Sequence, residues 1–333
     1  GFESTAHYAL NLELFLENAH HSFMEVNPVL IKEYKKSTTL RRTKTDSVDC
    51  ESIARWLITV EYKPHSKGFY HAYSLKSLTR LRDRLIRQRS FYLVKITNVL
   101  DHTFPEFKPF FNERLSKTAL YLLENYGSAE KMARMNSASY DKLRCISRGK
   151  FSIQQFLRLK ELAANTVGVN NSIFDLELNT LLTLYKSLSD EINTLETEII
   201  KLIEEVHPHY MSIPGIGPIS SAVIYAEYGD ISNFSNPGQM LAFAGIEPGI
   251  NDSGTESHGG RMVKHGSSQL RYVLLNACLP LIRFDLTFAT YYEKKRAEGK
   301  KHRVAITHVA KKLIRVIYAL ERQDVDFNAQ KIR

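Results

Sequence analysis

Apolar residues recur every three or four positions through two long segments of the chain. The first spans residues 74–101 and stops before Thr103-Phe104-Pro105. In the second, apolar positions follow one another in steps of four and three: Phe174, Leu178, Leu181, Tyr185, Leu188, Ile192, Leu195, Ile199, Leu202 and Val206. This spacing is typical of a coiled-coil seam. We therefore predict two long helices that form a projecting antiparallel coiled coil and take part in dimerisation.

Shorter elements of mixed type precede the first long segment. Residues 5–19 have helical periodicity, residues 21–26 alternate as a short strand does, and Asn27-Pro28 marks a turn. Residues 46–58 predict a further helix. A strand between helices indicates part of a layered α/β domain.

The residue pattern of the sequence changes after His207-Pro208. From there to about residue 325, Pro-Gly and Gly-Gly pairs separate short apolar stretches, as expected of short helices joined by tight turns. We therefore divide the chain into an α/β domain at 1–70, a helical region with the coiled coil at 71–206, and an α-rich C-terminal domain at 207–333.

The composition is that of a globular protein, with 333 residues, 43% of them hydrophobic and 24% charged. Cys50, Cys145 and Cys278 have no paired spacing, which excludes a disulfide framework and a thiolate zinc site. No apolar run reaches the roughly 20 residues of a membrane helix, and the first residues have no secretory pattern. We expect a cytoplasmic protein without a membrane partner.

Positive charge is concentrated towards the C-terminal end. Residues 261–333 contain 16 Lys and Arg against 6 Asp and Glu, whereas the formal net charge of the whole chain is +9. The remainder is therefore close to neutral. Such a distribution is typical of a surface that binds polyphosphate, although solvated helix faces would give the same composition.

The sequence Ser212-Ile213-Pro214-Gly215-Ile216-Gly217-Pro218, followed by an apolar helix, has the form of a helix-hairpin-helix. Its Gly-x-Gly turn leaves backbone N–H groups free at the next helix's N-terminus, where the helix dipole favours a phosphate. Contacts of this kind hold the nucleic-acid backbone without reading sequence. The alternative is a tight turn between helices with no ligand.

Two aspartates share one face of a predicted helix, because Asp46 and Asp49 lie three positions apart. Glu3 lies upstream, near the start of another helix. Three carboxylates from separate elements suit Mg²⁺, and a metal pair suits phosphodiester cleavage. Because both aspartates are also good residues for capping a helix and complementing its dipole, spacing alone leaves both roles open.

Ser253-Gly254 belongs to a polar loop at residues 251–261. A serine there is a nucleophile if the basic neighbours Arg261, Lys264 and Arg271 stabilise the phosphoryl group under attack. Without that help, Ser-Gly is simply a turn.

Taken in order, these segments resemble insertion-sequence transposases of the IS110/IS116/IS902 type. Glu3-Ser4-Thr5-Ala6-His7-Tyr8 resembles that family's Glu-x-Thr-Gly-x-Tyr, and Lys44-Thr45-Asp46-Ser47-Val48-Asp49 resembles its Lys-Thr-Asp-x-x-Asp. Further matching segments are Asn27-Pro28 and residues 214–217, 243–248, 253–254, 264–266 and 270–271. Each motif is weak alone, but the ordered set is specific.

These transposases, the bridge-RNA-guided recombinases, pair an RNase H/RuvC-like DEDD domain with a serine-bearing C-terminal domain. The resemblance implies that Glu3, Asp46 and Asp49 are three of four acids at a two-metal Mg²⁺ site. It also implies that Ser253 is the nucleophile that joins to DNA, with Ser257 as the neighbouring alternative. Such an enzyme moves a mobile element by cutting and rejoining DNA at sites chosen by a structured guide RNA. The expected partners are DNA, guide RNA and further copies of the chain, as a dimer or tetramer.

The resemblance and the charge together give the residues expected to contact nucleic acid. These are Gly215, Gly217, Arg261, Lys264, Arg271, Lys300, Lys301, Arg303, Lys311 and Lys312. The Arg-rich helix that starts near Ser74 is a further candidate.

The first acid of the DEDD set, expected on a strand upstream of Glu3, has no counterpart in the sequence. We therefore expect a partial RNase H-like domain without its opening strands, and a chain that is inactive as it stands. A sheet edge or apolar helix faces should then lie uncovered near Glu3.

Geometry separates three classes of function. An RNA-guided transposase requires Glu3, Asp46 and Asp49 to converge. In a non-catalytic nucleic-acid-binding protein, these acids only cap helices while the basic surface and the Gly-x-Gly turn bind backbone. A coiled-coil scaffold requires the basic residues of 261–333 to spread over all faces.

Overall fold

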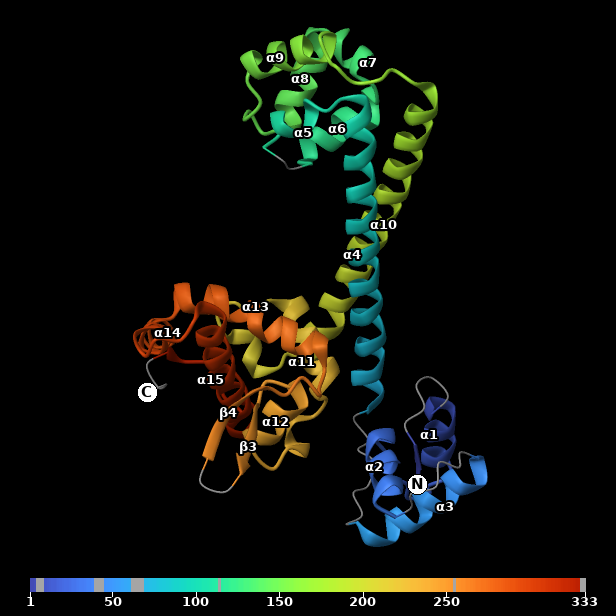
Figure 1. The fold of residues 1–333 in the computed structure, drawn as a ribbon, viewed down its shortest axis with the longest axis vertical. Coiled ribbons are helices and arrows are strands. Elements are labelled where there is room, and N and C mark those ends of the chain that lie inside the picture. Colours follow the sequence, from blue (N-terminus) through green and yellow to red (C-terminus); the bar gives the residue numbers. More distant parts are fainter. Residues whose placement is uncertain (4–8, 39–44, 61–68, 113–114, 254–255, 330–333) are drawn as a thin grey trace. The chain divides into compact units, whose positions relative to one another are not determined.

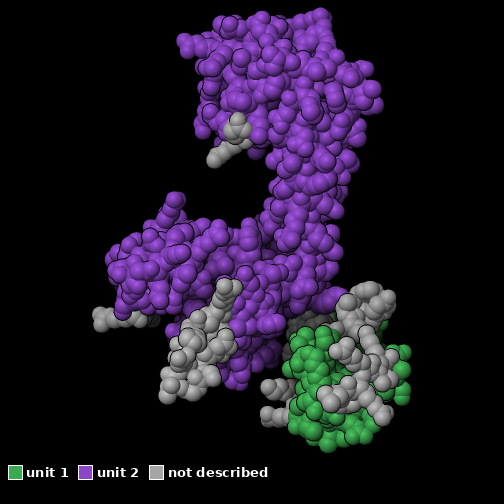
Figure 2. All heavy atoms as spheres, in the orientation of Figure 1, with its two compact units in different colours: residues 1–70 green, residues 71–333 purple. Residues whose placement is uncertain are grey.

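The computed structural model of the chain describes residues 1–3, 9–38, 45–60, 69–112, 115–253 and 256–329. Most of this is helix, and the strands in these ranges form two sheets of two strands each (Figure 1). The predicted mainly helical fold class is therefore confirmed. The chain divides into two compact units, 1–70 and 71–333 (Figure 2).

The first unit is a small α/β layer. Its elements are β1 (Phe2–Glu3), α1 (Ala9–Asn18), β2 (Glu25–Val26), α2 (Pro28–Thr38) and α3 (Asp46–Thr59). The two strands pair in parallel, with Glu3 opposite Val26. Parallel strands need a crossover connection, and α1 lies within it. The strand predicted at 21–26 and the helix predicted at 46–58 are both present.

Asn27-Pro28 proves to be the start of a helix, whereas the sequence analysis interprets it as a turn. The Asn27 side-chain oxygen accepts a hydrogen bond from the backbone N–H of Val29 at 2.9 Å. Pro28 is the first residue of α2, a position where its missing N–H costs nothing and its fixed φ suits a helix.

Several large apolar side chains of the first unit lie in solvent. Phe15 is 64% exposed and Ile58 is 84% exposed, and α1 also exposes Leu12 and Leu14. Glu13 on the same helix is buried. Helix α1 therefore turns a carboxylate inward and apolar groups outward, the reverse of the usual distribution. The uncovered apolar helix faces expected in this part of the chain are present.

The second unit contains the remaining elements. They are α4 (Phe69–Thr103), α5 (Phe107–Phe110), α6 (Lys117–Tyr126), α7 (Ala129–Ala133), α8 (Ser137–Ile146), α9 (Ile153–Ala164), α10 (Ser172–Val206), the 3-10 helix η2 (His209–Ser212), α11 (Pro218–Tyr228), the 3-10 helix η3 (Ile231–Asn233), α12 (Pro237–Ala244), β3 (Pro248–Ser253), β4 (Glu256–Met262), α13 (Ser268–Phe284), α14 (Leu286–Ala297) and α15 (His302–Gln323).

The two long helices α4 and α10 pack antiparallel (Figure 1). Leu75 near the start of α4 shares a core with Ile199 near the end of α10. Ile96, two turns before the end of α4, shares another core with Leu178 near the start of α10. Both long predicted helices are therefore present and paired, while the interlocking geometry of a true coiled coil stays a prediction.

Helices α5 to α9 occupy the stretch between the two long helices. The starts of α6 to α9 are set by short polar side chains: Ser116, Ser128, Asn136 and Ser152 each accept a hydrogen bond from the backbone N–H three residues further on. These helices share one apolar core with the adjoining ends of α4 and α10. This cluster of helices corresponds to the mixed helical stretch between the two apolar seams.

The C-terminal part packs around α15. Leu313 and Ile317 of α15 and Leu274 of α13 are fully buried in one core, which also includes residues of α11 and α12. Because this core and the α4–α10 pair lie in a single compact unit, the separate domains at 71–206 and 207–333 stay a prediction.

The structure corrects one expectation in this region. Residues 248–253 and 256–262 form the antiparallel strands β3 and β4, with Asn251 opposite His258, whereas a polar loop is expected at 251–261 from the sequence. Asn, Asp, Ser and Gly are depleted in strands, so local propensity does not indicate this hairpin.

In the described ranges, no single helix has the length and hydropathy of a membrane span. Helices α13 and α14 meet that criterion only as a pair, across a bend of 106°.

Candidate nucleic-acid interface and catalytic residues

The three predicted metal-binding acids lie on two elements of the first unit. Glu3 ends β1, Asp46 begins α3, and Asp49 lies almost one turn further along α3. The N-cap of α3 is Thr45, whose side chain accepts a hydrogen bond from the backbone N–H of Val48. The exposed Asp46 is therefore not the capping residue of the helix.

Asp49 already has a cationic partner. The ammonium of Lys35 on α2 forms an ion pair with its carboxylate. Among the described residues, no three His, Cys, Asp or Glu side chains are arranged to hold a metal ion. Carboxylates are the donors that Mg²⁺ prefers, but Lys35 engages one of them, so the arrangement as it stands does not fit the ion. The metal-binding role of Glu3, Asp46 and Asp49 stays a prediction.

Ser253 is the last residue of β3, next to the tip of the hairpin, where it pairs in register with Glu256 of β4. Arg261 lies on β4. Gly254 lies outside the described residues, and so do the side chains of residues 249–261. The nucleophilic role of Ser253, the neighbouring alternative Ser257 and the phosphate contact of Arg261 stay predictions.

The base of this hairpin is held by a close crossing of two backbone segments. Gly245 ends α12 in the left-handed region, with φ of 64°. Gly266 passes so near the carbonyl of Phe243 that any Cβ would collide with it. The guanidinium of Arg271 donates to the carbonyl oxygen of Ala244 at 3.1 Å. Close packing and backbone conformation therefore require glycine at positions 245 and 266. The hydrogen bond from Arg271 stabilises the end of α12.

The two glycines of the Gly-x-Gly turn have different surroundings. Gly215 has φ of +97°, and a Cβ there would lie 2.7 Å from Cγ of Pro280 and 2.9 Å from the carbonyl oxygen of Ala277. Gly217 is the N-cap of α11, with φ of −79° and no side-chain cap, and a Cβ there would meet nothing within 4 Å. Gly215 therefore allows close packing on α13, whereas Gly217 leaves the start of α11 open to a ligand.

The helix before this turn is the 3-10 helix η2, which has four residues. The complete helix-hairpin-helix motif therefore stays a prediction. An uncapped helix start with exposed backbone N–H groups is nonetheless a suitable place for a phosphate.

Basic residues gather where α14 meets α15. Burial lowers the pKa of His308, and the charges of Lys311, Lys295 and Lys300 lower it further. Burial and the charge of Arg315 lower the pKa of Lys311. Like charges are thus held close together, as they are on surfaces that bind polyanions.

The start of α15 adds to this charge. Lys300, Lys301 and Arg303 are exposed there, and the N-cap residue Lys301 makes no side-chain cap. Cations at a helix N-terminus oppose the helix dipole. A bound phosphate would offset this unfavourable arrangement. We call the basic residues Lys295, Lys300, Lys301, Arg303, His308, Lys311, Lys312 and Arg315 the α14–α15 basic surface.

Sequence reasoning missed Lys295, His308 and Arg315 of this surface. On α15, positions 308, 311, 312 and 315 follow the spacing of one helix face, so a helical projection of the sequence would have joined His308 and Arg315 to Lys311 and Lys312. Lys295 comes from another helix, and its proximity has no signal in the sequence. Lys264 is exposed between β4 and α13.

Two arginines of α4 join it to neighbouring helices. Arg80 donates two hydrogen bonds to the Glu227 carboxylate on α11, from Nε to Oε1 at 3.0 Å and from Nη2 to Oε2 at 3.2 Å. Arg82 pairs with Glu196 on α10 at 2.5 Å. These two residues therefore hold helices together, which weakens the expectation that the Arg-rich helix binds nucleic acid.

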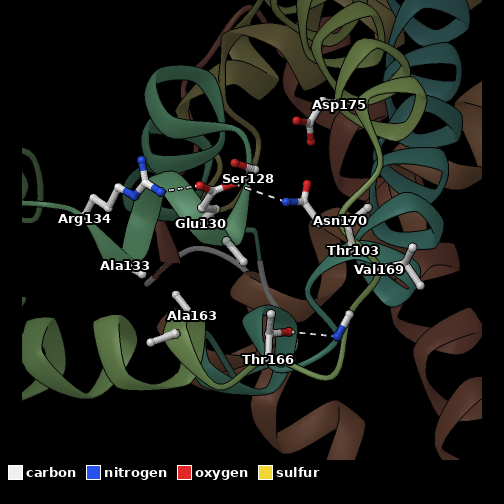
Figure 3. A pocket seen from close by; sticks show the side chains of 13 residues that line it. Thr103, Ser128, Glu130, Ala133, Arg134, Ala163, Thr166, Val169, Asn170 and Asp175 are labelled. Atoms are coloured by element: carbon white, nitrogen blue, oxygen red, sulfur yellow. Dashed lines mark hydrogen bonds and ion pairs between the residues drawn. The ribbon is translucent and has the colours of Figure 1, made fainter.

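A pocket of about 330 Å³ lies among α7, the start of α10 and the segment before it (Figure 3). Glu130 lines this pocket. It forms an ion pair with Arg134 at 2.5 Å and accepts a hydrogen bond from the side-chain amide of Asn170 at 3.2 Å. Because these polar groups satisfy one another, we assign this pocket no ligand.

Two family models match the chain. One, described as "Transposase IS116/IS110/IS902 family", matches residues 208–293. The other, the model of the IS110-type DEDD domain, described as "Transposase", matches residues 1–105. Together they include the acids of the first unit, the Gly-x-Gly turn and Ser253.

Relatives align with most of the chain. It is 27% identical over 245 residues to the uncharacterized 43.6 kDa protein of insertion element IS110 from Streptomyces coelicolor, covering 71% of this chain and 60% of that protein. It is 28% identical over 298 residues to the uncharacterized 42 kDa protein of IS900 from Mycobacterium paratuberculosis, covering 84% and 71%. It is 25% identical over 260 residues to the transposase of IS1111A from Coxiella burnetii, covering 78% and 59%.

The chain belongs to the IS116/IS110/IS902 family of insertion-sequence transposases. It spans 60% of the IS110 protein and 59% of the IS1111A transposase.

Proposed function

We propose that this chain belongs to a transposase that cuts and rejoins DNA under the guidance of a structured RNA. The observation that carries the nucleic-acid-binding part of the proposal is the α14–α15 basic surface. Lys295, Lys300 and Lys311 lie close enough to His308 to lower its pKa, and Arg315 does the same to Lys311. Such clustering argues against a scaffold with incidental charge. The open start of α11 beside Gly217 adds a backbone site for phosphate.

The catalytic nucleophile in this proposal is Ser253. Its hydroxyl oxygen attacks the scissile phosphorus, the bond from phosphorus to the leaving strand's oxygen breaks, and that oxygen takes up a proton. Rejoining reverses the step with the hydroxyl of another strand, which releases the serine. Because a phosphodiester-like bond is kept throughout, no external energy source is needed. The position of Ser253 at the end of β3, next to the tip of the hairpin, supports this role.

Glu3, Asp46 and Asp49 are the proposed Mg²⁺-binding acids of the assembled enzyme. Hard oxygen donors suit that ion, and binding it requires Asp49 to exchange its ion pair with Lys35 for the metal. The sites would be chosen by base pairing between guide RNA and DNA, so the protein needs backbone contacts more than base readout. Assembly as a dimer or tetramer along the α4–α10 pair completes the proposal.

Adduct formation tests the catalytic proposal. Protein expressed from its whole reading frame is incubated with Mg²⁺, the element's flanking RNA and labelled donor DNA, and covalent protein–DNA adducts are resolved under denaturing conditions. We expect an adduct in the wild type that is lost in Ser253→Ala and Asp46→Ala. Ser257→Ala is the matched control and should keep the adduct. An adduct lost only in Ser257→Ala would move the nucleophile to that residue.

The second candidate is a nucleic-acid-binding protein without catalysis. The observation that favours it is the ion pair of Lys35 with Asp49, which engages one of the predicted metal ligands. Binding of DNA and RNA by the wild type, with no adduct under any metal condition, would select this function over the transposase.

A further inference from the structure

A pocket in the C-terminal part of the chain is not explained by contacts to nucleic-acid backbone. It has a volume of about 470 Å³ and lies between α14, one face of α15 and the segment that follows α15. Pockets that bind small molecules measure about 300–1,000 Å³, so this one can take a single ring system with its substituents. We call it the α14–α15 pocket.

The floor of the pocket is apolar. Val316 and Leu320 of α15 line it with Ala319 between them, and Val325 closes it from the following segment. Val316 and Leu320 are at most 9% exposed and belong to the C-terminal core. A flat apolar ligand surface would displace water from this floor at little cost.

The rim carries an aromatic ring and two cations. Tyr291 comes from α14, and Lys312 and Arg315 come from α15. The ammonium of Lys312 lies 5.3 Å from the centre of the Tyr291 ring and 5.3 Å from that of Phe288, which fixes its position. In the part of the chain that the structure describes, Arg315 has no hydrogen-bond or ion-pair partner. Both cations thus face an apolar pocket beside an aromatic ring.

The far edge of the pocket carries polar side chains that are held in place. Gln323, Asp326 and Asn328 line it. The Asp326 carboxylate lies 2.9 Å from Nδ1 of His209, and the backbone N–H of Phe327 donates to the Ser212 hydroxyl at 2.8 Å. This wall is therefore anchored to the segment that leads into the Gly-x-Gly turn.

We propose that the α14–α15 pocket binds one unpaired nucleotide of a nucleic-acid strand, with its base over the apolar floor and its phosphate at Lys312 and Arg315. The amide and carboxylate groups at the far edge supply the donors and acceptors that a base edge requires. This inference rests on the proposed function as a nucleic-acid-binding transposase. It adds a site that recognises a nucleotide outside a double helix.

The shape of the site favours an unpaired base over a duplex. In a duplex the faces of the bases are stacked on one another, so only the backbone and the base edges reach a protein. Cations alone would serve that backbone, and an apolar floor beneath them would stay unused. A base that has left its stack offers a flat apolar face, which an aromatic side chain and this floor can cover.

A cavity-filling variant tests the inference without removing any charge. Ala319→Phe places a ring in the pocket, and Ala297→Phe is the matched control because Ala297 is exposed and does not line it. The probes are fluorescent single strands of twelve thymidines or twelve uridines and a DNA duplex of equal length, measured by anisotropy at one fixed salt concentration. The full chain is used, and circular dichroism checks that both variants are folded.

We expect Ala319→Phe to weaken binding of a single strand roughly tenfold, the effect of losing one stacked base, with duplex binding unchanged. The control should bind all probes as the wild type does. Loss with the thymidine strand, the uridine strand or both identifies DNA or RNA as the source of the nucleotide. Unchanged single-strand binding, or an equal loss for the duplex, would overturn the inference while leaving the proposed function intact. A wild type that binds none of the probes would instead remove the proposed function.

Crosslinking gives a second readout that does not depend on folding of a variant. A single strand that contains 5-iodouridine should crosslink to Tyr291 in the wild type, and excess uridine monophosphate should compete. Crosslinks confined to lysines elsewhere on the α14–α15 basic surface would contradict the assignment of the pocket.

Discussion

Glu13 is the residue whose environment conflicts most with its chemistry. It is 1% exposed, and neither of its carboxylate oxygens has a hydrogen-bond partner among the residues that the structure describes. Burial raises its pKa to about 7, and the charges of Glu25 and Glu17 contribute to the rise. An unpaired buried carboxylate is costly in its ionised form. The first unit should therefore be sensitive to pH.

The direction of that sensitivity follows from the two pKa values. Because the folded pKa of about 7 lies above the ordinary glutamate value of 4.5, the folded unit holds a proton that the unfolded chain has lost between these pH values. Stability from Glu13 is complete below pH 4.5, falls as pH rises towards 7 and is constant above that. The loss is on the order of 3 kcal/mol.

Urea unfolding at pH 5 and pH 8 measures this effect. The chain has one tryptophan, Trp56, which lies on α3 in the first unit and reports its unfolding by fluorescence. Glu13→Gln should remove most of the difference between the two pH values. Glu33→Gln, a change at an exposed acid of the same unit, should leave it. Equal pH dependence in wild type and Glu13→Gln would show that Glu13 is not responsible.

At the scale of elements, the hydrophobic repeat of the sequence predicted the long helices correctly. The strand propensities of the residues did not predict the β3–β4 hairpin. The seam from Phe174 to Val206 predicted α10 almost to its ends, because long repeats outweigh local preferences. The β3–β4 hairpin was missed because its residues are those of turns, and its ladder forms only where the two glycine segments at its base cross. Pairing of this kind depends on residues distant in sequence.

The candidate site likewise combines motifs that are visible in the sequence with contacts that only the structure shows. The Gly-x-Gly turn, Ser253 and the acids were found as motifs, since each is local in the sequence. The ion pair of Lys35 with Asp49 was not foreseen, because it joins two helices across a segment of unrelated residues. The pocket beside Tyr291 was not foreseen either, since its lining comes from three segments.

The two glycines of the turn make a matched pair for separating packing from binding. Gly215→Ala places a methyl group against Pro280 at a φ of +97°, so we expect a loss of roughly 1–3 kcal/mol in the free energy of unfolding. Gly217→Ala meets no neighbour and should cost less than about 1 kcal/mol. It should nonetheless weaken DNA binding, because the methyl group obstructs the open start of α11. Unfolding curves and duplex anisotropy on both variants check this. Unchanged binding in Gly217→Ala would mean that the turn carries no phosphate.

The contact between α4 and α11 depends on a buried carboxylate. The side chain of Glu227 is 2% exposed and pairs with Arg80 at 3.0 Å. Arg80→Met leaves that charge without its main partner, which typically costs about 3–5 kcal/mol. The double variant Arg80→Met with Glu227→Gln should recover much of the loss, because no charge then remains buried. Thermal unfolding of the four proteins gives the coupling, and additive losses would contradict it.

At the scale of the whole molecule, we expect nucleic-acid binding to depend more on where the positive charges lie than on the net charge. The formal net charge of +9 would attract nucleic acid from any side, and in that case every exposed lysine would contribute alike. The α14–α15 basic surface predicts otherwise. Neutralising a lysine that contacts phosphate removes about one unit from the slope of log affinity against log salt. Lys300→Gln and Lys301→Gln should each do so, whereas Lys142→Gln on the exposed face of α8 should leave the slope unchanged. All three variants lower the net charge equally, so equal slopes among them would show that total charge governs binding and that the surface is incidental.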